Sequence, residues 1–212
     1  MPKPDSHPKL MNAANVLTFA RIILVPAVLV LLLLIEPEVR TINWWSMEMP
    51  EPVGRNQFYG ILAVIFFVVA SLTDLLDGYL ARKYQLVTNL GKLLDPLADK
   101  ILVLGTMIIL VQMGRLPGWM VVVVLSRELA VTSLRGVVGA DGVVIAASQL
   151  GKYKTVVQDF SLGFVMLYYP VHGVNVYAVG IVFFMLAVAL TIWSGVDYFL
   201  AFRGALSGKK KA

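Results

Sequence analysis

The stretch "VLVLLLLI", residues 28–35, decides the fold class of this chain, because it is apolar without interruption. Inside a bilayer every backbone polar group must be satisfied internally, so only α-helices and closed β-barrels can cross it. A barrel strand alternates apolar and polar side chains, and this stretch does not alternate. It therefore predicts a membrane helix, which we place at residues 16–35.

The composition of the whole chain extends this prediction. Of the 212 residues, 58% are hydrophobic and 15% are charged, whereas a soluble domain has roughly 25% charged residues. Apolar runs of about 20 residues, enough to cross a bilayer, recur without an internal repeat or a second domain. We expect an all-α integral membrane protein, a six-transmembrane-helix bundle in the single domain 1–212. The predicted helices are 16–35, 57–81, 92–113, 118–139, 153–170 and 174–203.

Lysine and arginine predict how the bundle is oriented. With both termini in the cytoplasm, three of the 18 basic residues, Arg40, Arg55 and Arg115, lie on the outer side and the rest on the cytoplasmic side. This distribution fits the positive-inside rule. The formal charge of +5 is thereby explained by orientation in a membrane, and no nucleic-acid partner is expected.

Four aspartates interrupt this apolar chain within 26 residues. Asp74 and Asp77 are three residues apart near the end of the second predicted helix. Asp95 and Asp99 are four apart at the start of the third. Residues at these spacings share a helix face, and the turn between the two helices folds them into a hairpin. We therefore expect the carboxylates to converge in a polar cavity that faces the cytoplasm.

Carboxylates so close together at membrane depth repel one another, and a divalent cation would keep them ionised. The chain has no cysteine, and no histidine lies nearby. Oxygen-only ligands favour Mg²⁺, Mn²⁺ or Ca²⁺ over zinc, and Mg²⁺ in particular is often shared with substrate phosphates. Gly78 and Gly91 would permit close approach of a ligand. Arg82 would contact a phosphate or extend to the membrane surface.

Two other interpretations compete with a metal-dependent enzyme. Buried carboxylates also line ion pathways, so a divalent-cation carrier is the alternative from another class. Against it, the far half of the same helices, "ILAVIFFVV" and "ILVLGTMIILV", is apolar and carries no charged residue. A purely structural role leaves the cost of burying four carboxylates without any compensation.

The aspartates belong to the pattern D-x₂-D-G-x₂-A-R-x₈-G-x₃-D-x₃-D, which is complete between residues 74 and 99. This pattern resembles the signature of the CDP-alcohol phosphatidyltransferase family. The resemblance implies that Asp74, Asp77 and Asp95 hold Mg²⁺ or Mn²⁺ and that Asp99 is the general base, an additional metal ligand, or both. The residues implied to line the pocket for the cytidine diphosphate group include Asp74 and Asp77, with Gly78, Ala81, Arg82 and Gly91. The family also implies a homodimer.

Three further segments are similar to the family members that use sn-glycerol 3-phosphate. They are "NAANVLTFARIILVP" (12–26), "SRELAVTSLRGVVGADGVVIAASQLGKYKTVVQ" (126–158) and "TIWSGVDYF" (191–199). The implied reaction transfers the phosphatidyl group from CDP-diacylglycerol to sn-glycerol 3-phosphate, giving phosphatidylglycerophosphate and CMP. A family member with serine or inositol phosphate as acceptor is the alternative. The expected location is a bacterial inner membrane, with an organellar membrane as the alternative.

A phosphorylated acceptor requires cations, and four basic residues are candidates. Arg127 and Arg135 are eight residues apart, about two helical turns, and Lys152 and Lys154 precede the fifth predicted helix. Both side-chain types suit phosphate, although the lysines also fit the cytoplasmic flank of a membrane helix. Glu128 would orient Arg127 or only neutralise it.

Polar residues of the first predicted helix are candidates for lining the same cavity. Asn15, Thr18 and Arg21 recur there at helical spacing, although helix capping explains Asn15 equally well. Asp159 and Asp197 are expected to pair with cationic side chains and receive no catalytic role.

Overall fold

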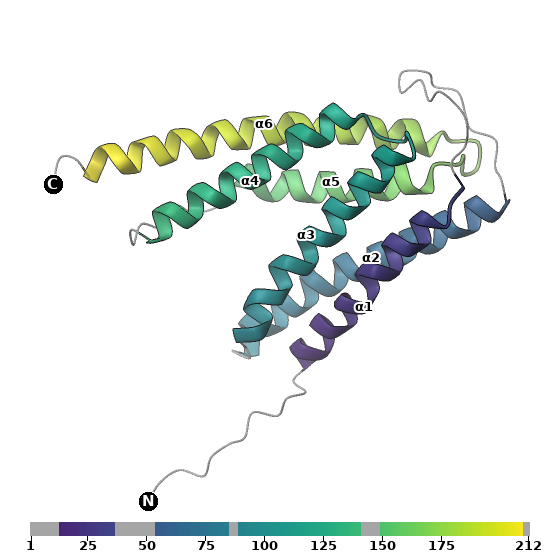
Figure 1. Ribbon diagram of the computed structural model, residues 1–212, viewed down its shortest axis with the longest axis horizontal. Helices are drawn as coiled ribbons and strands as arrows, with labels where there is room; N and C mark the ends of the chain where they lie inside the picture. The colour runs from purple at the N-terminus through teal and green to yellow at the C-terminus, as the bar shows by residue number, and fades with distance from the viewer. Residues whose placement is uncertain (1–12, 37–53, 85–88, 141–148, 210–212) are drawn as a thin grey trace, which may run out of the picture.

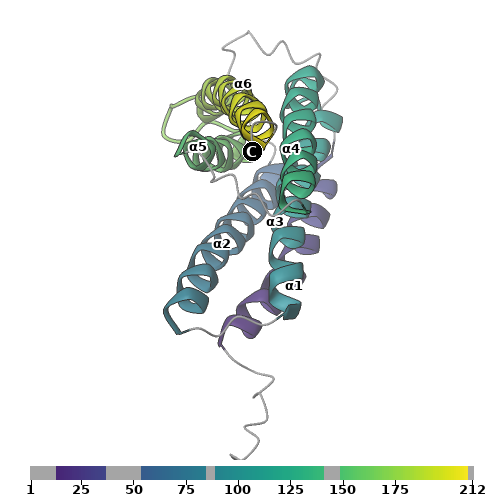
Figure 2. The same cartoon turned by 90° about the vertical axis from the view of Figure 1, so that its left-hand side faces the viewer.

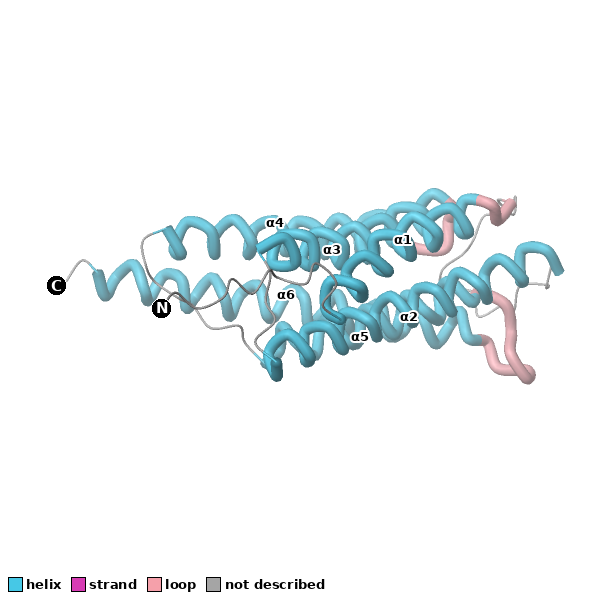
Figure 3. The backbone as a smooth tube through the Cα atoms, turned by 90° about the horizontal axis from the view of Figure 1, so that it is seen from below, coloured by secondary structure: helices cyan, strands magenta, loops and turns pink. Residues whose placement is uncertain are grey.

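The computed structural model describes the backbone of residues 13–36, 54–84, 89–140 and 149–209, and the side chains of residues 20–36, 54–73, 97–137 and 150–204. Nearly all of this backbone is helical (Figure 3). Six helices follow one another along these residues, which confirms the predicted all-α class. They are α1 (Ala13–Leu33), α2 (Gly54–Tyr84), α3 (Asn89–Gln112), α4 (Gly118–Ala140), α5 (Gln149–Leu167) and α6 (Val176–Lys209).

The helices form two groups that meet along α2 and α5. In one group α1 packs against α2 and α3, and in the other α6 packs against α5 and α4. Figures 1 and 2 show the first group crossing the second at an angle. Contacts between α2 and α5 join the two groups, so a cavity between the groups has its walls on these two helices.

The turn between α3 and α4 is closed by backbone hydrogen bonds. Gly114 has a φ of 72°, in the left-handed region that glycine adopts at helix C-termini. The amides of Arg115 and Leu116 donate to the carbonyl of Leu110 at 2.8 and 3.1 Å. Pro117, which cannot continue a helix from within, then precedes α4.

The end of α5 differs from the prediction. The predicted helix continued to residue 170, whereas α5 ends at Leu167. Tyr168 has a φ of 60°, which leaves the right-handed helical region, and Pro170 cannot donate a helical hydrogen bond. The next helix is capped by Asn175, whose side-chain oxygen accepts a hydrogen bond from the amide of Ala178 at 3.0 Å.

The interior and the outer surface of the bundle are both apolar. Fully buried side chains come from each helix: Leu32, Phe67, Met107, Leu110, Val124, Leu162, Met166 and Phe184. Outward-facing side chains are also large and apolar, including Ile23 (72% exposed), Leu129 (68%) and Trp193 (67%). Exposed apolar surface on this scale is typical of contact with lipid or a partner.

Two helical segments in the described residues are long and apolar enough to cross a bilayer. They are Gly54–Thr73 in α2 and Val176–Gly204 in α6, and Ala20–Leu33 of α1 is a shorter apolar segment. These segments, together with the apolar surface, fit a membrane protein.

Candidate active site

The aspartates predicted to form the metal site lie on the two helices expected to carry them. Asp74 and Asp77 are in the last part of α2, and Asp95 and Asp99 are in the first part of α3. These helix ends lie at the same end of the bundle (Figure 1). The side chains of Asp74, Asp77 and Asp95 lie outside the described residues. So do those of the remaining predicted pocket residues Gly78, Ala81, Arg82 and Gly91.

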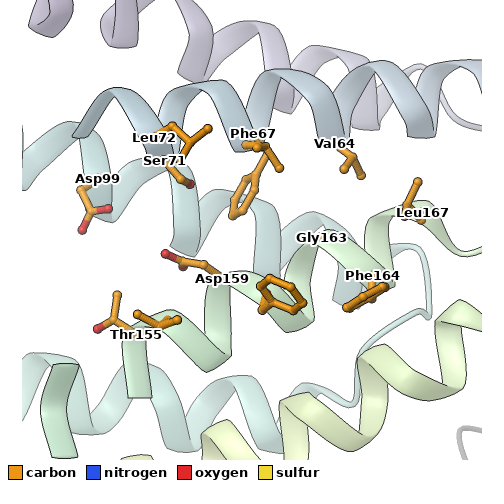
Figure 4. A pocket seen from close by; sticks show the side chains of 13 residues that line it. Val64, Phe67, Ser71, Leu72, Asp99, Thr155, Asp159, Gly163, Phe164 and Leu167 are labelled. Atoms are coloured by element: carbon orange, nitrogen blue, oxygen red, sulfur yellow. The ribbon is translucent and has the colours of Figure 1, made fainter. Parts of the chain in front are cut away.

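Asp99 is the aspartate of this set whose side chain is described, and it lines a cavity. The cavity has a volume of about 430 Å³ and lies between α2, α3 and α5. Asp99 is partly buried and occupies one end of the cavity together with Ser71, Thr155 and Asp159 (Figure 4). This end of the cavity is polar and carries two carboxylates.

The rest of the cavity wall is apolar. Figure 4 shows the side chains of Phe164 and Leu167 at the opposite end from Asp99, with Phe67 between the two ends. The other apolar wall residues are Val64, Val68, Leu72, Val156 and Phe160. Gly163 also lies on the wall, and a Cβ added there would have no atom within 4 Å. The cavity therefore suits a ligand with a long apolar part and a polar end.

Asp159 is a site residue that the sequence interpretation missed. It was expected only to pair with a cation, yet it lies on the cavity wall near Asp99 (Figure 4). Its position one turn after Thr155 and one turn before Gly163 was the available signal, because residues four apart share a helix face. That face lines the cavity between α2 and α5.

A second polar cluster lies on the α4 side of α5. Arg127 Nη1 donates to Glu128 Oε1 at 3.2 Å, and Lys154 Nζ donates to the same oxygen. Arg127 Nη2 donates to Ser194 Oγ of α6 at 3.0 Å. We call these four residues the α4–α5–α6 junction. It brings together two of the four cations predicted for the acceptor phosphate.

The other two predicted cations lie elsewhere. The Arg135 guanidinium lies over the Tyr198 ring, 5.6 Å from its centroid, and Lys152 is exposed on α5. Lys100, next to Asp99, was not predicted as a site residue. Its Nζ donates to Thr132 Oγ1 at 3.1 Å and so links the carboxylate end of α3 to α4.

The polar residues of α1 are described only in part. Arg21 is fully buried, so a cation lies inside the first group of helices. The side chains of Asn15 and Thr18 lie outside the described residues.

The donor chemistry of the aspartates fits a hard divalent cation. They supply only oxygen, from neighbouring turns of two adjacent helices, and Mg²⁺ and Mn²⁺ prefer such ligands. Among the described side chains, no group of three or more His, Cys, Asp or Glu residues could hold a metal. Asp99, which is described, has its carboxylate at the polar end of the cavity (Figure 4).

Comparison with known proteins defines the class of this chain. The sequence profile of the CDP-alcohol phosphatidyltransferase family matches residues 11–193. The chain belongs to that family.

Curated relatives show which members of the family this chain resembles. The chain is 40% identical over 193 residues to the CDP-diacylglycerol--glycerol-3-phosphate 3-phosphatidyltransferase of Bacillus subtilis, covering 90% of this chain and 94% of the relative. It is 34% identical to the protein of the same name from Rickettsia typhi, covering 91% and 97%. It is 36% identical to a probable phosphatidylglycerophosphate synthase of Mycobacterium tuberculosis, covering 90% and 81%.

Proposed function

We propose that this protein transfers the phosphatidyl group of CDP-diacylglycerol to sn-glycerol 3-phosphate in a metal-dependent reaction, giving phosphatidylglycerophosphate and CMP. Membership of the family and the names of its relatives support this proposal. The observation that carries it is the cavity, in which Asp99 lies at the polar end of an otherwise apolar space of about 430 Å³. A lipid nucleotide has the same division between an apolar and a polar part.

The donor lipid fits the cavity in one direction. Its apolar part lies along the α2–α5 wall, where Phe67, Phe164 and Gly163 are located. Its pyrophosphate then lies at the Asp99 end, beside the turns of α2 and α3 that carry the family pattern. Gly78, Ala81, Arg82 and Gly91 line the cytidine diphosphate pocket in this proposal.

Asp74, Asp77 and Asp95, with Asp99 as a further ligand, would hold Mg²⁺ or Mn²⁺. Such an ion neutralises negative charge on the pyrophosphate and on the departing phosphate. The carboxylates contribute by holding the positive charge of the ion at one end of the cavity.

Asp99 has the second role of base. Its carboxylate accepts the proton of the acceptor's terminal hydroxyl while that oxygen bonds to the phosphorus that carries diacylglycerol. The bond from this phosphorus to the bridging oxygen breaks, and CMP leaves with that oxygen. General-base catalysis of this kind contributes about 10²- to 10⁴-fold.

The acceptor's phosphate is bound first by Arg127 and Lys154, and Arg135 and Lys152, the other two predicted cations, lie apart from this pair. Arg127 and Lys154 already lie together at the α4–α5–α6 junction. Asn15, Thr18 and Arg21 of α1 line the cytoplasm-facing polar region that the sequence predicts, outside the apolar space between α2, α3 and α5.

In this proposal all six helices of the single domain 1–212 cross a bacterial inner membrane, and the cavity faces the cytoplasm. Both termini are cytoplasmic, and the protein acts as a homodimer. The two membrane-length segments and the apolar outer surface support the membrane location. The excess of basic residues on one side supports the orientation.

The experiment is CMP release by purified protein given CDP-diacylglycerol and Mg²⁺ with one acceptor at a time. Release that requires sn-glycerol 3-phosphate supports the proposal. Release with only serine or inositol phosphate would keep the chemistry and replace the acceptor. No release with any acceptor from folded protein, together with metal uptake into vesicles, would favour the cation carrier.

A further inference from the structure

The α4–α5–α6 junction is built around one carboxylate oxygen. Glu128 Oε1 accepts hydrogen bonds from both Arg127 Nη1 and Lys154 Nζ. It thereby connects a cation of its own helix, α4, with a cation of α5. Figure 2 shows α4, α5 and α6 running beside one another.

The junction is largely removed from solvent, although it carries three charges. The Lys154 side chain is 5% exposed, that of Arg127 16% and that of Glu128 25%. A buried ammonium requires a partner, and Glu128 supplies one. Two more charged side chains lie close enough to interact with these three, Asp159 with Lys154 and Lys100 with Glu128. Three cations then face two carboxylates, so the group keeps one positive charge, which suits an anionic ligand.

Arg127 and Lys154 keep donors for such a ligand. A guanidinium and an ammonium each have more N–H donors than these hydrogen bonds use. The Nε–H of Arg127 is buried and has no hydrogen-bond partner among the described residues. A buried donor left unsatisfied is unfavourable, so an incoming phosphate oxygen would be stabilised there.

Helix α6 fixes the direction of the Arg127 side chain. In "TIWSGVDYF" of α6, Ser194 Oγ accepts from Arg127 Nη2 at 3.0 Å and donates to the carbonyl of Thr191 at 3.1 Å. A Cβ added to Gly195 would lie 3.1 Å from Arg127 Cγ, closer than most real Cβ contacts. The serine orients the guanidinium, and the glycine leaves room for its stem.

We propose that Glu128 is a positioning residue for the acceptor's phosphate. It holds Arg127 and Lys154 at a fixed separation, with Ser194 and Gly195 setting the course of Arg127, so that both cations meet the phosphate together. This inference rests on the proposed function, because the phosphate is that of the acceptor. The competing explanation is that Glu128 only neutralises buried Lys154 so that the chain folds.

Glu128→Asp separates the two explanations, because it keeps the charge and withdraws the carboxylate by one methylene. Positioning predicts that the KM for sn-glycerol 3-phosphate and its Kd from calorimetry both rise roughly tenfold or more, since small misplacements have large effects. The KM for CDP-diacylglycerol stays within about twofold. Gly195→Ala, which displaces Arg127 without removing a charge, shows the same selective rise.

Glu36→Gln is the matched control, since Glu36 forms an exposed ion pair with Arg55 away from the junction. It changes neither constant. A folded Glu128→Asp protein with an unchanged Kd for sn-glycerol 3-phosphate overturns the inference. So does a rise that is equal for both substrates.

The calorimetric measurement of binding tests this inference separately from the proposed function. Wild-type protein that binds sn-glycerol 3-phosphate or inorganic phosphate, but not glycerol, and loses that affinity in Glu128→Asp supports the positioning role even where no CMP is released. Wild-type protein that binds neither phosphate compound contradicts it, whatever its turnover.

Discussion

Two buried basic side chains, at opposite ends of the bundle, are stabilised in different ways. Arg115, in the α3–α4 turn, lies 3.9 Å from the centroid of the Tyr168 ring and donates to the carbonyl of Met166 at 3.4 Å. Tyr177 Oη donates to the carbonyl of Arg115 at 3.2 Å. Lys154 instead meets the carboxylate of Glu128, beside a second cation.

The difference suggests two roles, stabilisation at Arg115 and the proposed ligand binding at Lys154. The contacts of Arg115 with the Met166 carbonyl, the tyrosine rings and the Tyr177 hydroxyl tie the α3–α4 turn to the end of α5 and the start of α6. Lys154 and Arg127 share the carboxylate of Glu128, with Asp159 and Lys100 nearby, and the one positive charge left over is proposed to serve a charged ligand. Changes near Arg115 should therefore affect stability, and changes near Asp99 and the junction should affect kinetics.

The largest effect is expected at Asp99. Asp99→Asn keeps the shape of the side chain and removes the proton acceptor, so the rate of CMP release should fall about 10²- to 10⁴-fold. The midpoint of thermal unfolding should change little. An Asp99→Asn protein that retains most of its rate would show that Asp99 is not the base.

Gly163 tests the apolar half of the cavity. Gly163→Leu places a side chain in open space on the cavity wall, so long-chain CDP-diacylglycerol should lose roughly tenfold in kcat/KM relative to a short-chain analogue, at about 0.8 kcal/mol per displaced methylene. Gly136→Leu on α4, where a Cβ also meets open space, is the control. Equal loss for both chain lengths would place the lipid elsewhere.

Arg115→Met tests whether the buried arginine of the α3–α4 turn serves stability alone. It removes the contact with the Tyr168 ring and should lower the midpoint of thermal unfolding by roughly 5 °C. The KM for either substrate should not change. A selective rise in the KM for sn-glycerol 3-phosphate would mean that both buried cations serve the ligand.

The smallest effect is expected from the exposed pair of Glu36 and Arg55. Both side chains are more than half exposed, and such pairs contribute about 0–1 kcal/mol. Arg55→Gln should thus shift thermal unfolding by no more than about 3 °C and leave turnover unchanged. A larger shift would indicate that the contact between the end of α1 and the start of α2 is a major source of stability.

The sequence predicted the helices because long apolar runs have few alternatives in a membrane. The predicted helix ends were less accurate. Helix α5, for example, ends before Tyr168, whose positive φ angle is not visible in the composition of the sequence. The position of Asp99 on the first turns of α3 followed from spacing alone. The spacing of Asp159 and Gly163 places them on one face of α5, but the packing of that face against α2 is a long-range contact that has no local pattern.

The predicted phosphate-binding cations also show that contacts between helices are hard to predict from the sequence. Arg127 and Arg135 have the same charge and lie on the same helix, yet one meets Glu128 and the other lies over Tyr198. The contact of Arg127 with Glu128 was expected from their adjacency in the sequence, whereas the position of Arg135 over Tyr198 depends on how α6 packs against α4, which sequence spacing does not contain. The role of Ser194 is likewise visible only when α6 lies against α4.

The most direct test of the account follows isotope-labelled sn-glycerol 3-phosphate into lipid. Purified protein with CDP-diacylglycerol and Mg²⁺ should move the label into a phospholipid and release one CMP for each molecule incorporated. A chelator should stop both, and Mg²⁺ or Mn²⁺ should restore them. Release of CMP without labelled lipid, or labelled lipid at an undiminished rate with all divalent metal removed, would contradict the proposed reaction.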